Sequence, residues 1–151
     1  MTGPYGRLAL SAAGEEIMRA LVPVVLGTLL PADRPEREES LAAAMATLDD
    51  YLAHLSLPLQ RQARLLLGAL ALLPVRWLLL GSWARWRDTA PERIEAFLRR
   101  AQGSRLFALR RVYDFLQSMT TVAWFDLPVA WKEIGYPGPP IERPRREGVA
   151  W

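Results

Sequence analysis

The organisation of this chain is clearest in one stretch, residues 124–140, which read WFDLPVAWKEIGYPGPP. Asp126 is a residue type that caps helix N-termini, and Pro128 suits a first helical turn, where its missing N–H costs nothing. Gly135 supplies the left-handed residue that commonly ends a helix. Beyond it, closely spaced prolines exclude both helix and central strand. The stretch therefore predicts a short helix followed by an extended arm.

Similar capping residues and prolines divide the rest of the chain into helices. Ser11 is expected to cap a first helix, in which Pro23 predicts a kink or a break. A second helix is expected at about 35–54. Thr89-Ala90-Pro91-Glu92 has the pattern of a capping box with a first-turn proline, and it predicts another helix start. Ser104 is expected to cap the helix that leads to residue 124.

These elements predict the fold class and the domain organisation. No strand alternation of any length is present, and 151 residues suffice for one domain with its own core. We therefore predict an all-α protein, with a compact helical domain of about six or seven helices at 11–135. An N-terminal arm is expected at 1–10. An extended, Pro/Gly-rich partner-binding arm and tail is expected at 136–151.

The most apolar part of the chain lies at 59–86 and approaches a membrane span in length. Pro74 and Arg76 fall at its centre, and an arginine at the middle of a bilayer is costly. We therefore favour two helices that meet at Pro74 and are buried by other helices. The alternative is a region that lies flat on a membrane or faces a partner.

The composition excludes several kinds of site. The chain has no cysteine, which removes disulfides, thiolate zinc sites, iron–sulfur ligation and cysteine nucleophiles. His54 is the only histidine, and with Asp50 it offers two metal ligands where a site needs at least three. No nucleophile elbow or glycine-rich phosphate loop is present. We expect neither a metal nor a cofactor in this chain itself.

The charges are distributed unevenly, with a formal net charge of +3. Residues 1–60 carry 4 Arg against 8 acids, whereas 61–151 carry 15 Arg or Lys against 8 acids. The arginines at 85–111 are interspersed with acids and belong to no recognisable nucleic-acid module. They predict ion pairs and a rim that faces a partner protein rather than a nucleic-acid site.

The aromatic residues predict a protein–protein interface near the C-terminus. Six tryptophans are more than a core of this size needs, and tryptophan is enriched at interface hot spots. Trp77 and Trp124 fit a core position as well as an interface. The predicted partner-binding residues are Trp124, Phe125, Pro128, Trp131, Ile134, Tyr136, Pro137, Pro139 and Pro140.

The terminal motif also carries a resemblance to a known family. Its residues are Leu127-Pro128, Trp131 and Ile134-Gly135-Tyr136-Pro137-Gly138-Pro139. Together they resemble the C-terminal signature of the small (gamma) subunits of gluconate 2-dehydrogenase and related FAD-dependent sugar and alcohol dehydrogenases. The resemblance implies a non-catalytic accessory subunit that binds and stabilises a large dehydrogenase of the glucose–methanol–choline (GMC) type. It also implies that this large partner holds the FAD.

Localisation and an alternative function complete the expectations. The start of the chain shows neither a secretory signal nor a twin-arginine pair, so a cytoplasmic protein is expected by default. A periplasmic or membrane-associated location would then come through the partner. The alternative function is a peripheral membrane protein that uses the apolar region 65–83 and its Arg-rich flank.

Overall fold

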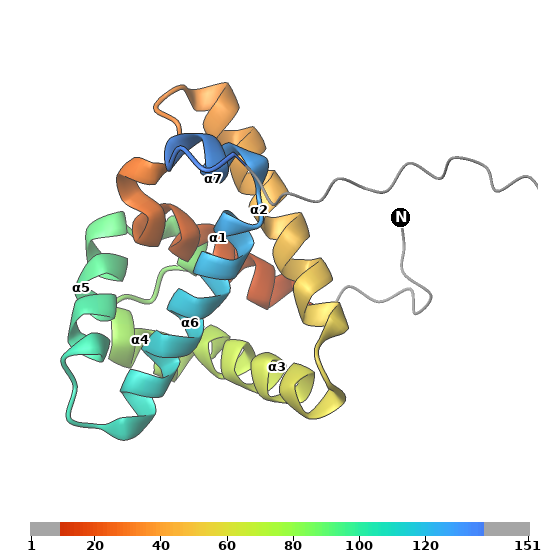
Figure 1. Ribbon diagram of the computed structural model, residues 1–151. Coiled ribbons are helices and arrows are strands. Elements are labelled where there is room, and N and C mark those ends of the chain that lie inside the picture. Colours follow the sequence, from red (N-terminus) through yellow and green to blue (C-terminus); the bar gives the residue numbers. More distant parts are fainter. Residues whose placement is uncertain (1–9, 138–151) are drawn as a thin grey trace, which may run out of the picture.

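The computed structural model describes residues 10–137, which form helices and no strand (Figure 1). This confirms the predicted all-α class with about six or seven helices. Residues 1–9 and 138–151 lie outside the described part, and with them most of both predicted arms. The elements are α1 (Ala12–Leu26), η1 (Gly27–Leu29), α2 (Arg34–His54), α3 (Leu57–Ala71), α4 (Leu73–Leu80), η2 (Trp86–Asp88), α5 (Pro91–Gln102), α6 (Phe107–Phe125) and α7 (Pro128–Glu133).

Helix α1 is the central element, because it contacts α2, α3, α5, α6 and η2. Ser11 caps it as predicted: the hydroxyl accepts a hydrogen bond from the N–H of Gly14 at 3.1 Å. Its side chains Ile17, Leu21 and Val22 are completely buried. The other helices therefore assemble around α1.

Pro23 lies inside α1 without breaking it, so the break, one of the two predicted outcomes, does not occur. The helix continues to Leu26, where Gly27 ends it and donates its N–H to the carbonyl of Pro23. An interior proline costs about 3 kcal/mol. Leu26 is buried and Val24 and Val25 pack against the core, so continuing the helix buries apolar side chains that offset this cost.

Helices α5 and α6 form close to their predicted positions, but each begins one or two residues later than predicted, and their predicted caps are wrong. Thr89 does not cap α5; its hydroxyl donates to the carbonyl of Arg85 at 2.8 Å. The N-cap is Ala90, whose extended backbone follows from the proline after it. Ser104 likewise accepts from the N–H of Leu106, and α6 starts only at Phe107.

Helices α3 and α4 meet at Leu72 with a bend of 74°, which confirms the predicted break near Pro74. Gly81 ends α4 in a left-handed conformation with φ of 63°. Two arginines of α5 then satisfy carbonyls at this end, because Arg93 donates to Leu80 and Gly81 and Arg100 donates to Leu79. The contacts lock α4 to α5.

Trp86 connects the α3–α4 bend to the core. Its indole N–H donates to the carbonyl of Leu70 at 2.9 Å, in a buried bond, and its ring packs edge-on against Phe97. Leu70 lies in the last turn of α3, where carbonyls lack helical partners. The indole therefore satisfies a buried acceptor that the helix itself leaves unpaired.

Replacing Trp86 by Phe is expected to lower the free energy of unfolding by about 1–3 kcal/mol, because the Leu70 carbonyl then stays buried without a donor. Urea unfolding followed by circular dichroism measures the change. The matched control is Trp83→Phe in the same loop, at an exposed position, with an expected change within about 0.5 kcal/mol. Equal midpoints for the two variants would contradict this role of Trp86.

Candidate partner-binding surface

Helix α7 follows α6 directly and is anchored on one side only. Leu127 and Ala130 are buried, and Val129 packs against the core. The indole N–H of Trp131 donates to the carbonyl of Phe125 at 2.8 Å, which ties α7 to the last residue of α6. Figure 1 shows α7 at one end of the molecule, where the described chain finishes. The described part of the terminal motif, up to residue 137, is therefore a fixed part of the fold.

Asp126 does not cap α7, so this prediction is wrong. Its N–H donates to the carbonyl of Val122, and its backbone is still helical, so it belongs to the end of α6. The N-cap is Leu127, which is extended and offers no side-chain hydrogen bond. Because Leu127 precedes Pro128, the proline ring excludes a helical conformation there and shifts the cap by one residue.

The end of α7 has the hydrogen bonds of a Schellman motif. The N–H of Tyr136 donates to the carbonyl of Trp131 at 2.8 Å, and the N–H of Gly135 donates to that of Lys132 at 3.2 Å. Gly135 has φ of 68°, as predicted for the residue that ends the helix. The rings of Trp131 and Tyr136 meet edge to face at 6.1 Å. The chain after Gly135 thus folds back onto α7 at Tyr136.

The structure separates the predicted partner-binding residues by burial. Phe125, Ile134 and Tyr136 expose large apolar groups, and Pro128 and Pro137 are also exposed. Trp131 is half-buried. Trp124 is only 1% exposed, so it is a core residue and its assignment to the interface is wrong. Pro139 and Pro140 lie outside the described residues.

We define the α7 surface as Phe125, Pro128, Trp131, Ile134, Tyr136 and Pro137. Its members are aromatic or aliphatic, and the exposed charged residues Asp126 and Lys132 lie between them in the sequence. An apolar centre with a polar rim is the usual composition of a protein–protein interface. The arrangement can bind a partner, but it contains no nucleophile, general base or metal ligand set.

A second apolar surface lies on α3 and α4, where the favoured prediction was burial by other helices and the alternative was a region that lies flat on a membrane or faces a partner. The structure contradicts burial by other helices, because Leu65 is 74% and Leu78 70% exposed. Trp77 is half exposed and stacks on Trp83 with the ring centroids 5.7 Å apart, so Trp77 is not a core residue. We define the α3–α4 surface as Leu65, Leu72, Leu73, Trp77, Leu78 and Trp83.

The arginine of α4 does not belong to the α3–α4 surface. Arg76 is 8% exposed, and its Nη2 donates to the carbonyl of Trp83 at 2.9 Å. Its Nε is buried without a hydrogen-bond partner among the described residues. The charge that argues against a membrane span in the sequence is thus turned inward, and it holds the loop that carries Trp83.

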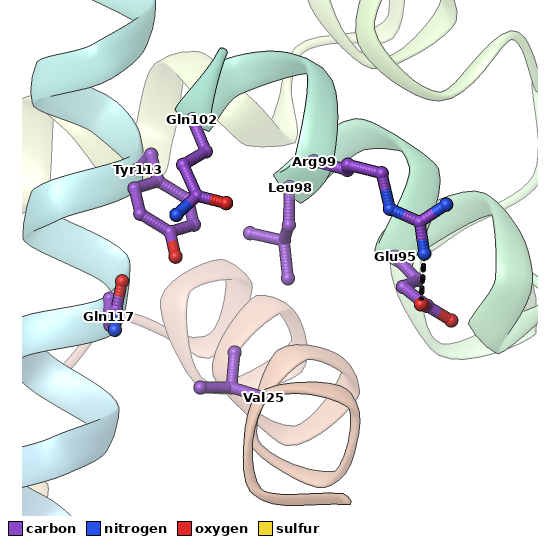
Figure 2. Close-up of a pocket in the computed structure, with 7 residues that line it drawn as sticks. All are labelled: Val25, Glu95, Leu98, Arg99, Gln102, Tyr113 and Gln117. Carbon is purple, nitrogen blue, oxygen red and sulfur yellow. Dashed lines mark hydrogen bonds and ion pairs between the residues drawn. The ribbon is translucent and has the colours of Figure 1, made fainter.

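The remaining candidate sites offer little chemistry. A shallow depression of about 230 Å³ is lined by Val25, Glu95, Leu98, Arg99, Gln102, Tyr113 and Gln117 from α1, α5 and α6. Figure 2 shows these side chains on three helices, with Arg99 paired to Glu95 along α5. The lining includes no histidine, serine or threonine beside a base. It does not have the composition of a catalytic site.

His54 and several of the arginines at 85–111 have local partners. His54 is exposed, and its Nδ1 lies 2.7 Å from the carbonyl of Asp50. Within the described residues, no group of three or more histidine, cysteine or acidic side chains is placed to hold a metal. Of the expected ion pairs, Arg99–Glu95 and Arg87–Asp88 form, both on the surface. Other arginines of this segment bind helix-end carbonyls instead.

Two further findings bear on function. Among the described helices none is by itself long and apolar enough to cross a membrane, and only the bent pair α3–α4 reaches the required length and composition. Comparison of the chain with protein-family models, curated proteins and solved structures found no match. The terminal motif therefore remains a resemblance.

Replacing Gly135 by Ala is expected to loosen the end of α7, because a side chain at φ of 68° costs about 1 kcal/mol. Hydrogen exchange of the Tyr136 amide should then accelerate, since its bond to Trp131 depends on this turn. Gly68→Ala is the matched control: it lies within α3 with open space around the added Cβ, and it should leave that exchange rate unchanged. An unchanged exchange rate of the Tyr136 amide in Gly135→Ala would contradict the Schellman motif at the end of α7.

Proposed function

We propose that this protein is a non-catalytic accessory subunit that binds and stabilises a large FAD-dependent dehydrogenase of the GMC type. The observation that carries the proposal is the α7 surface, an exposed apolar surface built on a short helix whose end is already locked. The resemblance of its motif to the small subunits of such dehydrogenases supplies the class of partner. The FAD and the oxidation belong to that partner.

The geometry of the α7 surface suits tight binding. The buried Leu127 and Ala130 fix α7 on one side, and the Trp131–Tyr136 contact and the Schellman hydrogen bonds fix its end. A surface that is ordered before docking loses less conformational entropy when it binds. The exposed Phe125, Ile134 and Tyr136 can then enter pockets of the partner as anchors.

An accessory role also fits what the described residues lack. The depression at α1, α5 and α6 has no catalytic arrangement, and the α7 surface has apolar groups where an enzyme needs acid–base groups. Stabilisation of a partner requires only that the two proteins bind in the folded state, which adds binding energy to the stability of both. No residue of this chain needs to touch the substrate.

The double variant Ile134→Ala/Tyr136→Ala is expected to weaken partner binding by more than about 30-fold, since hot-spot truncations cost 2 kcal/mol or more. The tagged full chain is purified from its native host, and the flavin absorption of the eluate is measured against the amount of chain. The wild type should retain a flavoprotein, and the variant should lose it while its far-UV circular dichroism is unchanged.

The double variant Leu106→Ala/Phe107→Ala is the matched control. These residues are similarly exposed at the opposite end of α6, and their loss should not change the flavin content of the eluate. A colourless eluate from the wild type would refute the flavoprotein partner. If Ile134→Ala/Tyr136→Ala retained as much flavin as the wild type, the role of the α7 surface would be refuted.

A second variant tests the anchors that the sequence singled out first. Trp131→Ala/Tyr136→Ala removes the aromatic pair and the hydrogen bond from Trp131 to Phe125, so it should also release the flavoprotein. Because the core helices do not depend on these two rings, the variant should remain helical. Co-purification at the wild-type level would contradict this assignment.

A further inference from the structure

The α3–α4 surface is continuous across the bend between its two helices. Leu65 on α3 and Leu72, the C-cap residue at which α3 ends, are seven residues apart, about two helical turns along one face. On α4, Leu73 and Trp77 are four apart and also share a face, with Trp83 stacked on Trp77. The exposed Leu72 and Leu73 join the two stripes at the elbow. The exposed apolar side chains therefore form one L-shaped strip.

The segment of the chain that carries this strip has charges of a single sign. Between residues 51 and 87 the sequence has no aspartate or glutamate, and it has five arginines: Arg61, Arg64, Arg76, Arg85 and Arg87. Arg61 lies one turn before Leu65 on the same face, and Arg85 follows Trp83; both are exposed. Arg76 is turned inward, so it does not interrupt the apolar strip of α4. The strip is thus apolar at its centre and basic at its ends.

We propose that the α3–α4 surface docks on an anionic lipid membrane, with both helices lying in the plane of the interface. Leucine and tryptophan on one face with arginines beside them are the composition of interfacial helices. Tryptophan favours the headgroup level, which suits the stacked Trp77 and Trp83. Anionic headgroups complement the acid-free segment, and the bend of 74° matches two helices that lie on a surface rather than one that spans it.

The same observations disfavour a second copy of this chain as the occupant. A symmetric dimer would place two copies of the same basic, acid-free segment against each other, and the like charges would repel. Protein hot spots are usually anchors that fill pockets. One depression is lined by α1, α5 and α6 and another by α6 alone, and neither is lined by α3 or α4. An extended apolar strip fits a fluid lipid surface.

The test is flotation of the full-length chain with vesicles of equimolar phosphatidylcholine and phosphatidylglycerol, and with vesicles of phosphatidylcholine alone. The wild type is expected to float with the anionic vesicles and to bind the neutral ones more weakly. Leu65→Ser/Leu78→Ser should weaken binding by more than about tenfold, because two exposed apolar anchors are lost. Arg61→Gln/Arg85→Gln should weaken binding to anionic vesicles by about fivefold per arginine.

The matched control is Leu106→Ser/Phe107→Ser, which removes apolar groups of similar exposure outside the strip and should float like the wild type. Circular dichroism checks that each variant is folded. The proposal is overturned if the wild type binds neither kind of vesicle. It is also overturned if Leu65→Ser/Leu78→Ser floats with the anionic vesicles as much as the wild type does. A concentration-dependent dimer that this variant abolishes, without flotation of the wild type, assigns the strip to a second copy instead.

Discussion

The hydrogen bond from Trp86 to Leu70 resolves a problem that Pro74 creates. In an unbroken helix the carbonyl of Leu70 would accept from the N–H of residue 74, but proline has none. The chain bends at Leu72, and the freed carbonyl accepts the indole N–H of Trp86. The segment η2, which contains Trp86, packs against α1. One bond thus couples the bend to the central helix, and the exposure of the α3–α4 surface depends on this bend.

Proline and glycine explain why the helical organisation was predictable from the sequence. Five of the α-helices in the described chain have a proline in the first turn, where the missing N–H has no cost: α2, α3, α4, α5 and α7. Gly81 and Gly135 end α4 and α7 with positive φ. These signals are local, so the sequence alone locates them. The exact caps are not local, as Thr89 shows by bonding back to Arg85.

Burial was less predictable, because it depends on which side of a helix meets α1. The apolar residues of α3 surround the helix, and the sequence does not distinguish Leu67, which reaches the core, from Leu65, which faces outward. The tryptophans raise the same difficulty. Trp124 and Trp131 are seven residues apart in a similar context, yet the first is in the core and the second lies half-buried on α7. Composition indicates a surplus of aromatic groups, but packing decides which are exposed.

The two apolar surfaces lie on opposite ends of the molecule, with α7 at one end of Figure 1 and α3 at the other. The two surfaces share no residue. Helix α6 lies between them and contacts both α5 and α7. A ligand on one surface therefore leaves the other accessible. Because the α7 surface has mixed charges and the α3–α4 surface is basic and acid-free, the two also favour different ligands. Loss of binding at one surface should leave binding at the other intact, so each proposed role can be tested in the absence of the other.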